Sequence, residues 1–193
     1  MNLVKELYKS YEFQSDWDNI KDKIVWTSGN KRQVAVQHSI YCTDIYHDRC
    51  VKIKNMPGLE IEYNIINPLF KDTIFEQILN DYDGYGARFA VMDPLTLYST
   101  HIDPAPRIHL AIDTDDYNMF LFPTHNKMYK IPSNNHLYYV NTTEYHSFVN
   151  TSKNKKRIHF FFISDKVNES EDWNINPNAQ WYAKYEAQKT NKP

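Results

Sequence analysis

The stretch Arg157-Ile158-His159-Phe160-Phe161-Phe162 carries two kinds of side chain in alternation. Successive side chains of a β-strand point to opposite faces. A strand here therefore gives Arg157, His159 and Phe161 one face, predicted to point inward, and Ile158 and Phe160 the other. A guanidinium that points into a protein interior is destabilising unless it is paired. The pattern therefore predicts a bound carboxylate as the partner of Arg157.

Seven segments upstream of this strand have the same character, because β-branched and aromatic residues dominate them and turn-forming or charged residues separate them. The eight predicted strands are 87–92, 96–102, 107–113, 119–123, 127–131, 136–141, 146–150 and 157–164. Eight short strands at this spacing are typical of a sandwich or jelly roll. The sequence thus predicts a mainly β protein with a few flanking helices.

The first half of the sequence predicts those helices. Leu3, Val4, Leu7, Tyr8 and Tyr11 recur with a helical period, which predicts a helix over residues 2–12.

A second helix is expected over 73–82, with Asp72 as its cap and Gly84 and Gly86 ending it. Residues 24–26 and 33–37 are predicted to add strands to the edge of the same sheet, and the last twenty residues are predicted to contain a terminal helix.

Length and charge bound the kind of protein. With 193 residues, 41% of them hydrophobic, the protein is expected to form a single domain over 1–193. A net charge of −2 gives no electrostatic reason to expect nucleic acid or an anionic membrane as a partner. The first residues are charged where a signal peptide needs an apolar run, so we expect a cytoplasmic protein.

The two cysteines suggest one alternative metal site. His38, Cys42, His47 and Cys50 could bind zinc together, but their spacing matches none of the usual paired zinc motifs. We therefore expect Cys42 and Cys50 to be reduced thiols in a loop.

The candidate active-site chemistry begins at His101-Ile102-Asp103. Residues i and i+2 of a strand share a face, so both residues can point into a small barrel. A single His-x-Asp pair is a weak motif by itself. His146, at the start of a predicted strand, completes a set of two imidazoles and one carboxylate, which can hold Fe(II) by one face and leave three coordination positions open.

From Ala87 to about Ser164 the sequence resembles the aspartyl/asparaginyl β-hydroxylase family of Fe(II)- and 2-oxoglutarate-dependent dioxygenases, which includes bacterial proline hydroxylases. The motifs that carry the resemblance are Arg88-Phe89-Ala90-Val91-Met92-Asp93-Pro94, Thr100-His101-Ile102-Asp103, Arg107-Ile108-His109-Leu110, Val140-Asn141-Thr142-Thr143-Glu144-Tyr145-His146-Ser147-Phe148-Val149-Asn150 and Arg157-Ile158-His159.

The resemblance implies a double-stranded β-helix, which is a cupin-like jelly roll. It also implies iron bound by His101, Asp103 and His146, with the distal carboxylate of 2-oxoglutarate held by Arg157. Arg107 and His109 match an Arg-x-His element that lies by the cosubstrate, and His109 is expected to be a second carboxylate contact. The implied reaction is hydroxylation of a C–H bond with O₂, which releases succinate and CO₂.

Two positions matter for comparison with the family pattern. Ala90 falls in the region where an animal member has a serine that contacts the cosubstrate, so the cosubstrate contacts are expected to be redistributed here. Asp103 supplies a carboxylate ligand that the animal member lacks, which places this protein nearer the proline-hydroxylase branch. Halogenating relatives need that coordination position empty, so Asp103 favours hydroxylation.

The sequence leaves the substrate open among a free amino acid, an aspartyl or asparaginyl side chain of a protein, and a lipid or peptide group. Arg32 and Arg88 are candidates for a cation near the mouth that would favour a free amino acid. His159 shares the inward face with Arg157, and its role is open. The alternative from another class is a non-oxidising, metal-binding cupin-like isomerase or ligand-binding module.

Overall fold

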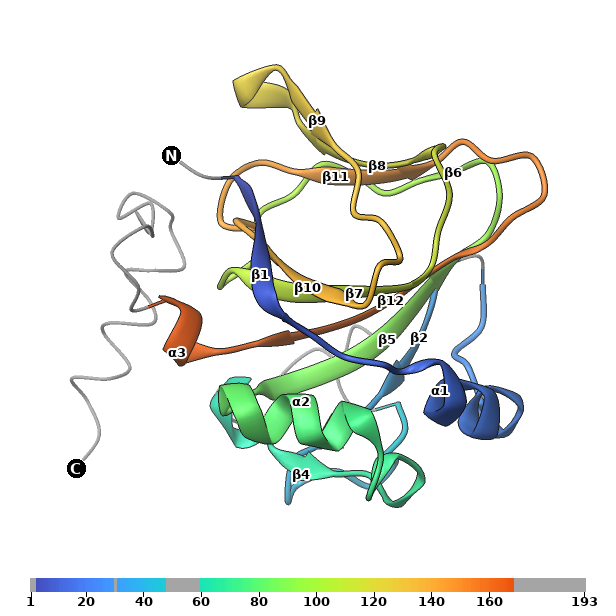
Figure 1. Ribbon diagram of the computed structural model, residues 1–193, viewed down its shortest axis with the longest axis vertical. Helices are drawn as coiled ribbons and strands as arrows, with labels where there is room; N and C mark the ends of the chain where they lie inside the picture. Colours follow the sequence, from blue (N-terminus) through green and yellow to red (C-terminus); the bar gives the residue numbers. More distant parts are fainter. Residues whose placement is uncertain (1–2, 30, 48–59, 169–193) are drawn as a thin grey trace.

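Two facing β-sheets form the body of the protein, with helices on the outside of one of them (Figure 1). The computed structural model describes residues 3–29, 31–47 and 60–168. The architecture is the mainly β jelly roll of cupin type that the sequence predicts, with antiparallel pairing throughout the two main sheets.

The larger sheet has six strands in the order β1, β10, β7, β12, β5, β2. Their bounds are Val4–Ser10 (β1), His136–Val140 (β10), Arg107–Asp113 (β7), Arg157–Ile163 (β12), Tyr85–Met92 (β5) and Lys31–Ala35 (β2). The strand that carries Arg157 is therefore internal, bonded to β7 on one side and β5 on the other.

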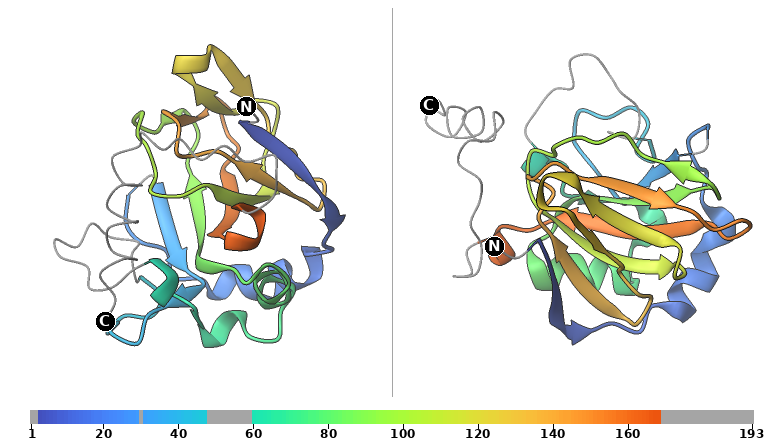
Figure 2. Two further views of the ribbon diagram at one scale, coloured as in Figure 1. Left: turned by 90° about the vertical axis from the view of Figure 1, so that its left-hand side faces the viewer. Right: turned by 90° about the horizontal axis from the view of Figure 1, so that it is seen from above.

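The smaller sheet has four strands in the order β6, β11, β8, β9. Their bounds are Thr96–Leu97 (β6), Ser147–Asn150 (β11), Asn118–Phe122 (β8) and Lys127–Tyr129 (β9). A separate pair joins β3 (Gln37–His38) to β4 (Ile65–Ile66). Figure 2 shows the two main sheets from two further sides.

The helical segments are short. They are α1 (Gln14–Ile20), η1 (Lys21–Lys23), η2 (Glu60–Glu62), η3 (Pro68–Phe70), α2 (Ile74–Tyr82), η4 (Pro123–His125) and α3 (Asp165–Asn168). Helices α1 and α2 lie against the face of the larger sheet that points away from the smaller one (Figure 1).

Strand alternation gives the larger sheet two different faces. On β12, Ile158, Phe160 and Phe162 belong to the apolar core that includes residues of α1 and α2. The alternate residues Arg157 and His159 face the space between the sheets, where they are 4% and 1% exposed. One face of the sheet thus makes the main core, and the other face supplies polar groups to the interior.

All eight strands predicted from residue 87 onward are present, with ends that differ by a few residues. The largest difference is at 96–102, where β6 ends at Leu97 and His101 forms only an isolated bridge. The strand predicted at 33–37 is also confirmed, because β2 pairs with β5 at the edge of the larger sheet.

The helix predicted over 2–12 is wrong, because this segment forms β1 and pairs with β10. Tyr8, which the helical stripe would have buried, is 98% exposed, whereas Leu3 and Tyr11 are each 3% exposed. A short isolated helix is marginal in water. The open edge of β10 offers backbone groups that an extended segment can satisfy.

Helix α2 confirms the helix predicted at 73–82, but its cap is not the predicted one. The helix is preceded by Thr73, without a side-chain cap, and the Ile74 N–H donates to Asp16 Oδ2 at 2.6 Å. Asp72 does not cap the helix with its side chain, and its own N–H donates to Glu76 Oε2. At the other end the left-handed residue is Asp83, with φ 47°, and the following Gly84 N–H donates to the Leu79 carbonyl. Gly84 is required for space, because a Cβ there would lie 2.6 Å from Leu79 and 2.7 Å from Phe162.

Residues 24–26 do not form the predicted strand. Ile24 follows η1 and is buried, Val25 is exposed, and Trp26 packs against the main core. The predicted terminal helix lies in 169–193, outside the described residues. Among the segments that are described, no helix has the length and apolar character needed to cross a bilayer.

Phe160→Ala is expected to lower the free energy of unfolding by about 3–5 kcal/mol, because it leaves a cavity in the core. Phe160 is fully buried and its ring contacts Phe75 and Phe89 at centroid distances of 5.3 and 5.2 Å. Chemical denaturation measures the change. The matched control is Tyr8→Ala on the exposed face of β1, expected to change stability by less than about 0.5 kcal/mol, and an equal loss in both variants would contradict the assignment of the core.

Candidate metal centre

The backbone brings His101, Asp103 and His146 together. His101 and His146 face each other in an antiparallel bridge in which each N–H donates to the other's carbonyl at 3.0 Å. Two residues further on, the Asp103 N–H donates to the Thr142 carbonyl at 2.9 Å. Hydrogen bonds between two segments some forty residues apart in the sequence therefore fix all three positions.

One potential ligand atom from each of the three side chains lies within 4.8 Å of the other two. His101 Nε2 is 3.7 Å from Asp103 Oδ1, and His146 Nε2 is 3.9 Å from Asp103 Oδ2. Among the residues that the structure describes, this is the one group of three or more histidine, cysteine, aspartate or glutamate side chains that could hold a metal ion.

Hydrogen bonds to the backbone set the tautomer of both histidines. His101 Nδ1 lies 2.7 Å from the Ser99 carbonyl oxygen, and His146 Nδ1 lies 2.9 Å from that of Glu144. A carbonyl oxygen only accepts, so each Nδ1 carries the proton and each Nε2 presents a lone pair. Carbonyl partners on the second nitrogen are typical of metal-bound histidines.

Two features of the three side chains fit a bound metal ion. His146 Nε2 is buried and has no hydrogen-bond partner in the described segments, which is rare for a buried nitrogen unless a ligand uses it. Two imidazoles and a carboxylate are also the donor set of non-haem Fe(II) sites. The centre is therefore compatible with Fe(II).

The charges around the centre keep its ligands in their binding forms. Burial raises the pKa of Asp103, but electrostatic interactions, first with the Arg107 cation and then with His146 and His101, outweigh it and hold the pKa below its usual value. Burial lowers the pKa of His146, and Asp103 offsets this only in part. At neutral pH the carboxylate is charged and the imidazole of His146 is neutral, as metal binding requires.

Arg107 is paired within the protein. Its Nε lies 3.2 Å from Asp103 Oδ2 and its Nη2 lies 3.6 Å from Glu60 Oε1. These partners hold the guanidinium beside the metal ligand, while Nη1 is buried without a partner. Arg107 therefore contacts Asp103 directly, and the predicted contact with a cosubstrate stays a prediction.

A cavity of about 130 Å³ opens beside the centre. Its walls include His101 and Asp103 of the triad and all three predicted cosubstrate residues, which are Arg107, His109 and Arg157. His146 is fully buried and is not among the lining residues. The structure thus brings together residues that the sequence separates by more than fifty positions.

Arg157 lies in this cavity without an acidic partner among the described residues. Its guanidinium carbon lies 4.9 Å from the ring centroid of Phe120 and 5.2 Å from that of Phe148, and Nη2 lies 3.3 Å from His159 Nδ1. Burial lowers its pKa to about 9, so the site disfavours an unpaired cation. A buried guanidinium of this kind is unfavourable by itself and would be stabilised by a bound anion.

Two buried histidines complete the basic end of the cavity. His109 stacks on Phe161 at 5.3 Å, and neither of its ring nitrogens has a partner. His159 lies 5.7 Å from it between ring centroids. Burial, followed by the cation of Arg157, lowers the pKa of both rings well below the usual value, so both are neutral.

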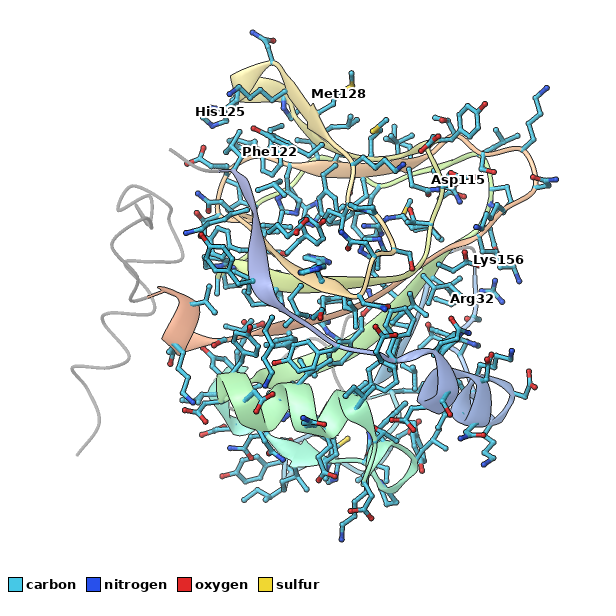
Figure 3. The ribbon with its side chains drawn as sticks, in the orientation of Figure 1. Arg32, Asp115, Phe122, His125, Met128 and Lys156 are labelled. Carbon is cyan, nitrogen blue, oxygen red and sulfur yellow. The ribbon has the colours of Figure 1, made fainter. Side chains whose placement is uncertain are left out.

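The two arginines proposed for the mouth also line the cavity. Arg32 on β2 pairs with Asp93 at 2.6 Å, and Arg88 on β5 lies over the ring of Phe161 at 5.1 Å. Figure 3 shows Arg32 on the same side of the molecule as Lys156. Ala90, the position that departs from the family pattern, lines the same cavity.

Sequence reasoning missed two residues of the site. Phe148 follows His146 by two positions, so strand alternation could have found it, and its ring lies 5.2 Å from that of His146. Glu60 gave no signal, because it lies far upstream of its partner Arg107 and only the fold brings them together.

The zinc alternative gains no support from the residues that are described. The two ring nitrogens of His47 form hydrogen bonds with the Asp44 carboxylate and the Val25 carbonyl. The Cys42 thiol donates to the Asp44 carbonyl at 3.0 Å. Cys50 lies outside the described residues.

No protein-family model matches the sequence, and no curated protein matches it either. Among solved structures, one similar protein is an oxidoreductase of the 2OG-Fe(II) oxygenase family from Burkholderia pseudomallei, 13% identical with a TM-score of 0.48, over 78% of this chain and 76% of that one. A cupin 2 domain-containing protein from Halorhodospira halophila is 10% identical with a TM-score of 0.33, over 55% of this chain and 67% of that one. Such distant similarity says nothing of chemistry, which must come from the geometry of the site.

His146→Ala is expected to weaken Fe(II) or Mn(II) binding by at least about 100-fold, because it removes a direct ligand and not only an outer partner. Calorimetric titration of the metal under anaerobic conditions measures the loss. His136→Ala is the control, since His136 lies on β10 with the Leu7 carbonyl as its partner. Equal metal affinity in the two variants would remove His146 from the centre.

Arg157→Met and Arg107→Met are expected to change stability in opposite directions. Replacing the unpaired cation of Arg157 by an apolar side chain should leave the ligand-free protein as stable or stabilise it by roughly 1–4 kcal/mol. The same change at Arg107 leaves the buried carboxylates of Asp103 and Glu60 without their cation. It should therefore destabilise the protein by on the order of 3 kcal/mol. Thermal and denaturant unfolding decide this, and a large destabilisation by Arg157→Met would mean that the protein itself pairs Arg157.

Proposed function

We propose that this protein is an Fe(II)- and 2-oxoglutarate-dependent dioxygenase that hydroxylates a C–H bond in the side chain of an amino acid, either free or within a peptide. One molecule each of 2-oxoglutarate, O₂ and substrate would give succinate, CO₂ and the hydroxylated product. The observation that carries the proposal is one cavity with two complementary ends, a His-Asp-His triad at one and a buried, unpaired arginine at the other.

His101, Asp103 and His146 would hold the iron, and a set of three protein ligands leaves coordination positions open for reactants. The iron would supply the activation of O₂ and the oxidative decarboxylation of 2-oxoglutarate. The role of the protein is to position the reactants and to exclude water.

Arg157 would hold the distal carboxylate of 2-oxoglutarate, and His109 would donate a second hydrogen bond. Phe148 lies between the two ends, since its ring is 5.2 Å from both the His146 ring and the Arg157 guanidinium carbon. A five-carbon dicarboxylate that reaches from the metal to Arg157 would therefore lie along this ring. Phe161 lines the cavity and stacks on His109, and Phe120 packs edge-on against the same ring, so the basic end is surrounded by apolar side chains.

A hydroxylase explains both the triad and the buried arginine of the cavity, whereas a non-oxidising cupin-like module explains only the triad. A metal-binding isomerase or ligand-capture module needs the triad but gives no specific reason for a buried arginine that has no carboxylate partner among the described residues. The cosubstrate of a dioxygenase gives that reason, because its distal carboxylate is the missing anion.

The substrate would enter past Arg32, Arg88 and Gln33, which line the cavity at β2 and β5. These groups can bind a carboxylate or an amide, which supports a free amino acid or a peptide as the substrate. O₂ is the third reactant.

The direct test is anaerobic purification, followed by addition of Fe(II), 2-oxoglutarate and O₂, with and without mixtures of free amino acids and of short peptides. We expect succinate in a yield that depends on 2-oxoglutarate and rises with the right substrate. His146→Ala should abolish it, and His136→Ala should not. Metal binding without any succinate would favour the non-oxidising module.

A further inference from the structure

Glu60 lies outside the part of the sequence that carries the family motifs, yet the fold places it beside the candidate metal centre. It is the first residue of η2, and its Oε1 lies 3.6 Å from Arg107 Nη2. The same guanidinium reaches a candidate metal ligand, because Arg107 Nε lies 3.2 Å from Asp103 Oδ2. Arg107 is therefore shared between a carboxylate of the triad and a carboxylate that the triad does not use.

Backbone hydrogen bonds hold Glu60 in this place. The Tyr63 N–H donates to the Glu60 carbonyl at 3.2 Å, and the Gly86 N–H of β5 donates to the Tyr63 carbonyl at 2.7 Å. Tyr63 is 2% exposed, and Gly86 has φ 64°, which favours glycine. The carboxylate of Glu60 is thus presented from a turn that is docked on the larger sheet.

The two contacts of Arg107 use one edge of its guanidinium. The Nε–H and one N–H of Nη2 point in the same direction, and together they form the fork that can bind both oxygens of a single carboxylate. In this structure the fork is divided, because Nε contacts Asp103 and Nη2 contacts Glu60. Asp103 Oδ1, which an undivided fork would engage, lies 3.7 Å from Nε2 of His101.

The division matters because a guanidinium and a metal ion compete for the lone pairs of a carboxylate. We propose that Glu60 is a positioning residue of the candidate metal centre. By binding Nη2 it keeps Arg107 from making a two-point contact with Asp103, and this leaves Oδ1 available to the metal. The inference rests on the proposed function, since it requires a metal ion at the triad.

Metal affinity in the folded protein tests this role. The probe is Mn(II), titrated by calorimetry into the full-length protein under anaerobic conditions, with circular dichroism to verify that each variant is folded. The variants are Glu60→Ala, Glu60→Gln, Arg107→Met and the double variant that combines Glu60→Ala with Arg107→Met. Glu12→Ala is the control, because Glu12 is an exposed glutamate between β1 and α1.

We expect Glu60→Ala to weaken Mn(II) binding by about 10- to 100-fold, because one further charged hydrogen bond then competes with the metal for Asp103. Glu60→Gln keeps an oxygen near Nη2, so its loss should be smaller, and Glu12→Ala should match the wild type. With Arg107→Met already present, Glu60→Ala should change the affinity by less than about 2-fold, because Glu60 acts through Arg107.

Other results overturn the inference. Unchanged Mn(II) affinity in a folded Glu60→Ala variant would mean that Glu60 does not position the ligand. An equal loss in the presence and absence of Arg107 would mean that the charge of Glu60 acts directly on the metal. Failure of the wild-type protein to bind Mn(II) would instead overturn the metal centre and with it the proposed function, so the two failures are distinguishable.

Discussion

The two-residue repeat of β12 is the constraint on which the rest of the structure depends. This internal strand is buried on both faces, and its alternate residues serve different purposes. Ile158, Phe160 and Phe162 bind the larger sheet to its helices, and Arg157 and His159 enter the cavity. A slip of one residue in register would exchange the two faces and place the basic groups in the apolar core. The packing of phenylalanine rings therefore also fixes where the buried basic groups lie.

The cavity holds polar groups that the protein itself does not satisfy. Among the described residues, His109, His146 and His159 have buried nitrogens without partners, and Arg157 is a buried cation without a carboxylate. Each of these groups reduces the stability of the ligand-free protein. Their concentration in one place is typical of a preorganised binding site, where stability is given up for function. The paired arginine Arg107 is the contrast, since its carboxylate partners come from the protein.

The candidate metal centre shows the same division between local and distant determinants. Ring orientation is local, because His101 and His146 each bond a carbonyl two residues before them in the sequence. The meeting of the two segments is not local, because it depends on the bridge between His101 and His146 and on the hydrogen bond from Asp103 to Thr142. The strand expected at 96–102 is mostly absent, yet the ligands still converge. The bridge and the hydrogen bond from Asp103 to Thr142 hold the three side chains together where the regular strand is absent.

The sequence by itself determined the strands from residue 87 onward, the two faces of β12, helix α2 and the membership of the triad. These follow from short-range patterns, since alternation, turn residues and helical period act over a few residues. Only the tertiary structure decided that residues 4–10 form an edge strand and not a helix, that Asp16 caps α2, and that Glu60 pairs with Arg107. Each of these depends on a partner dozens of residues away in the sequence. Whether Arg157 is paired or unpaired was likewise beyond the sequence, because it depends on every side chain that reaches the cavity.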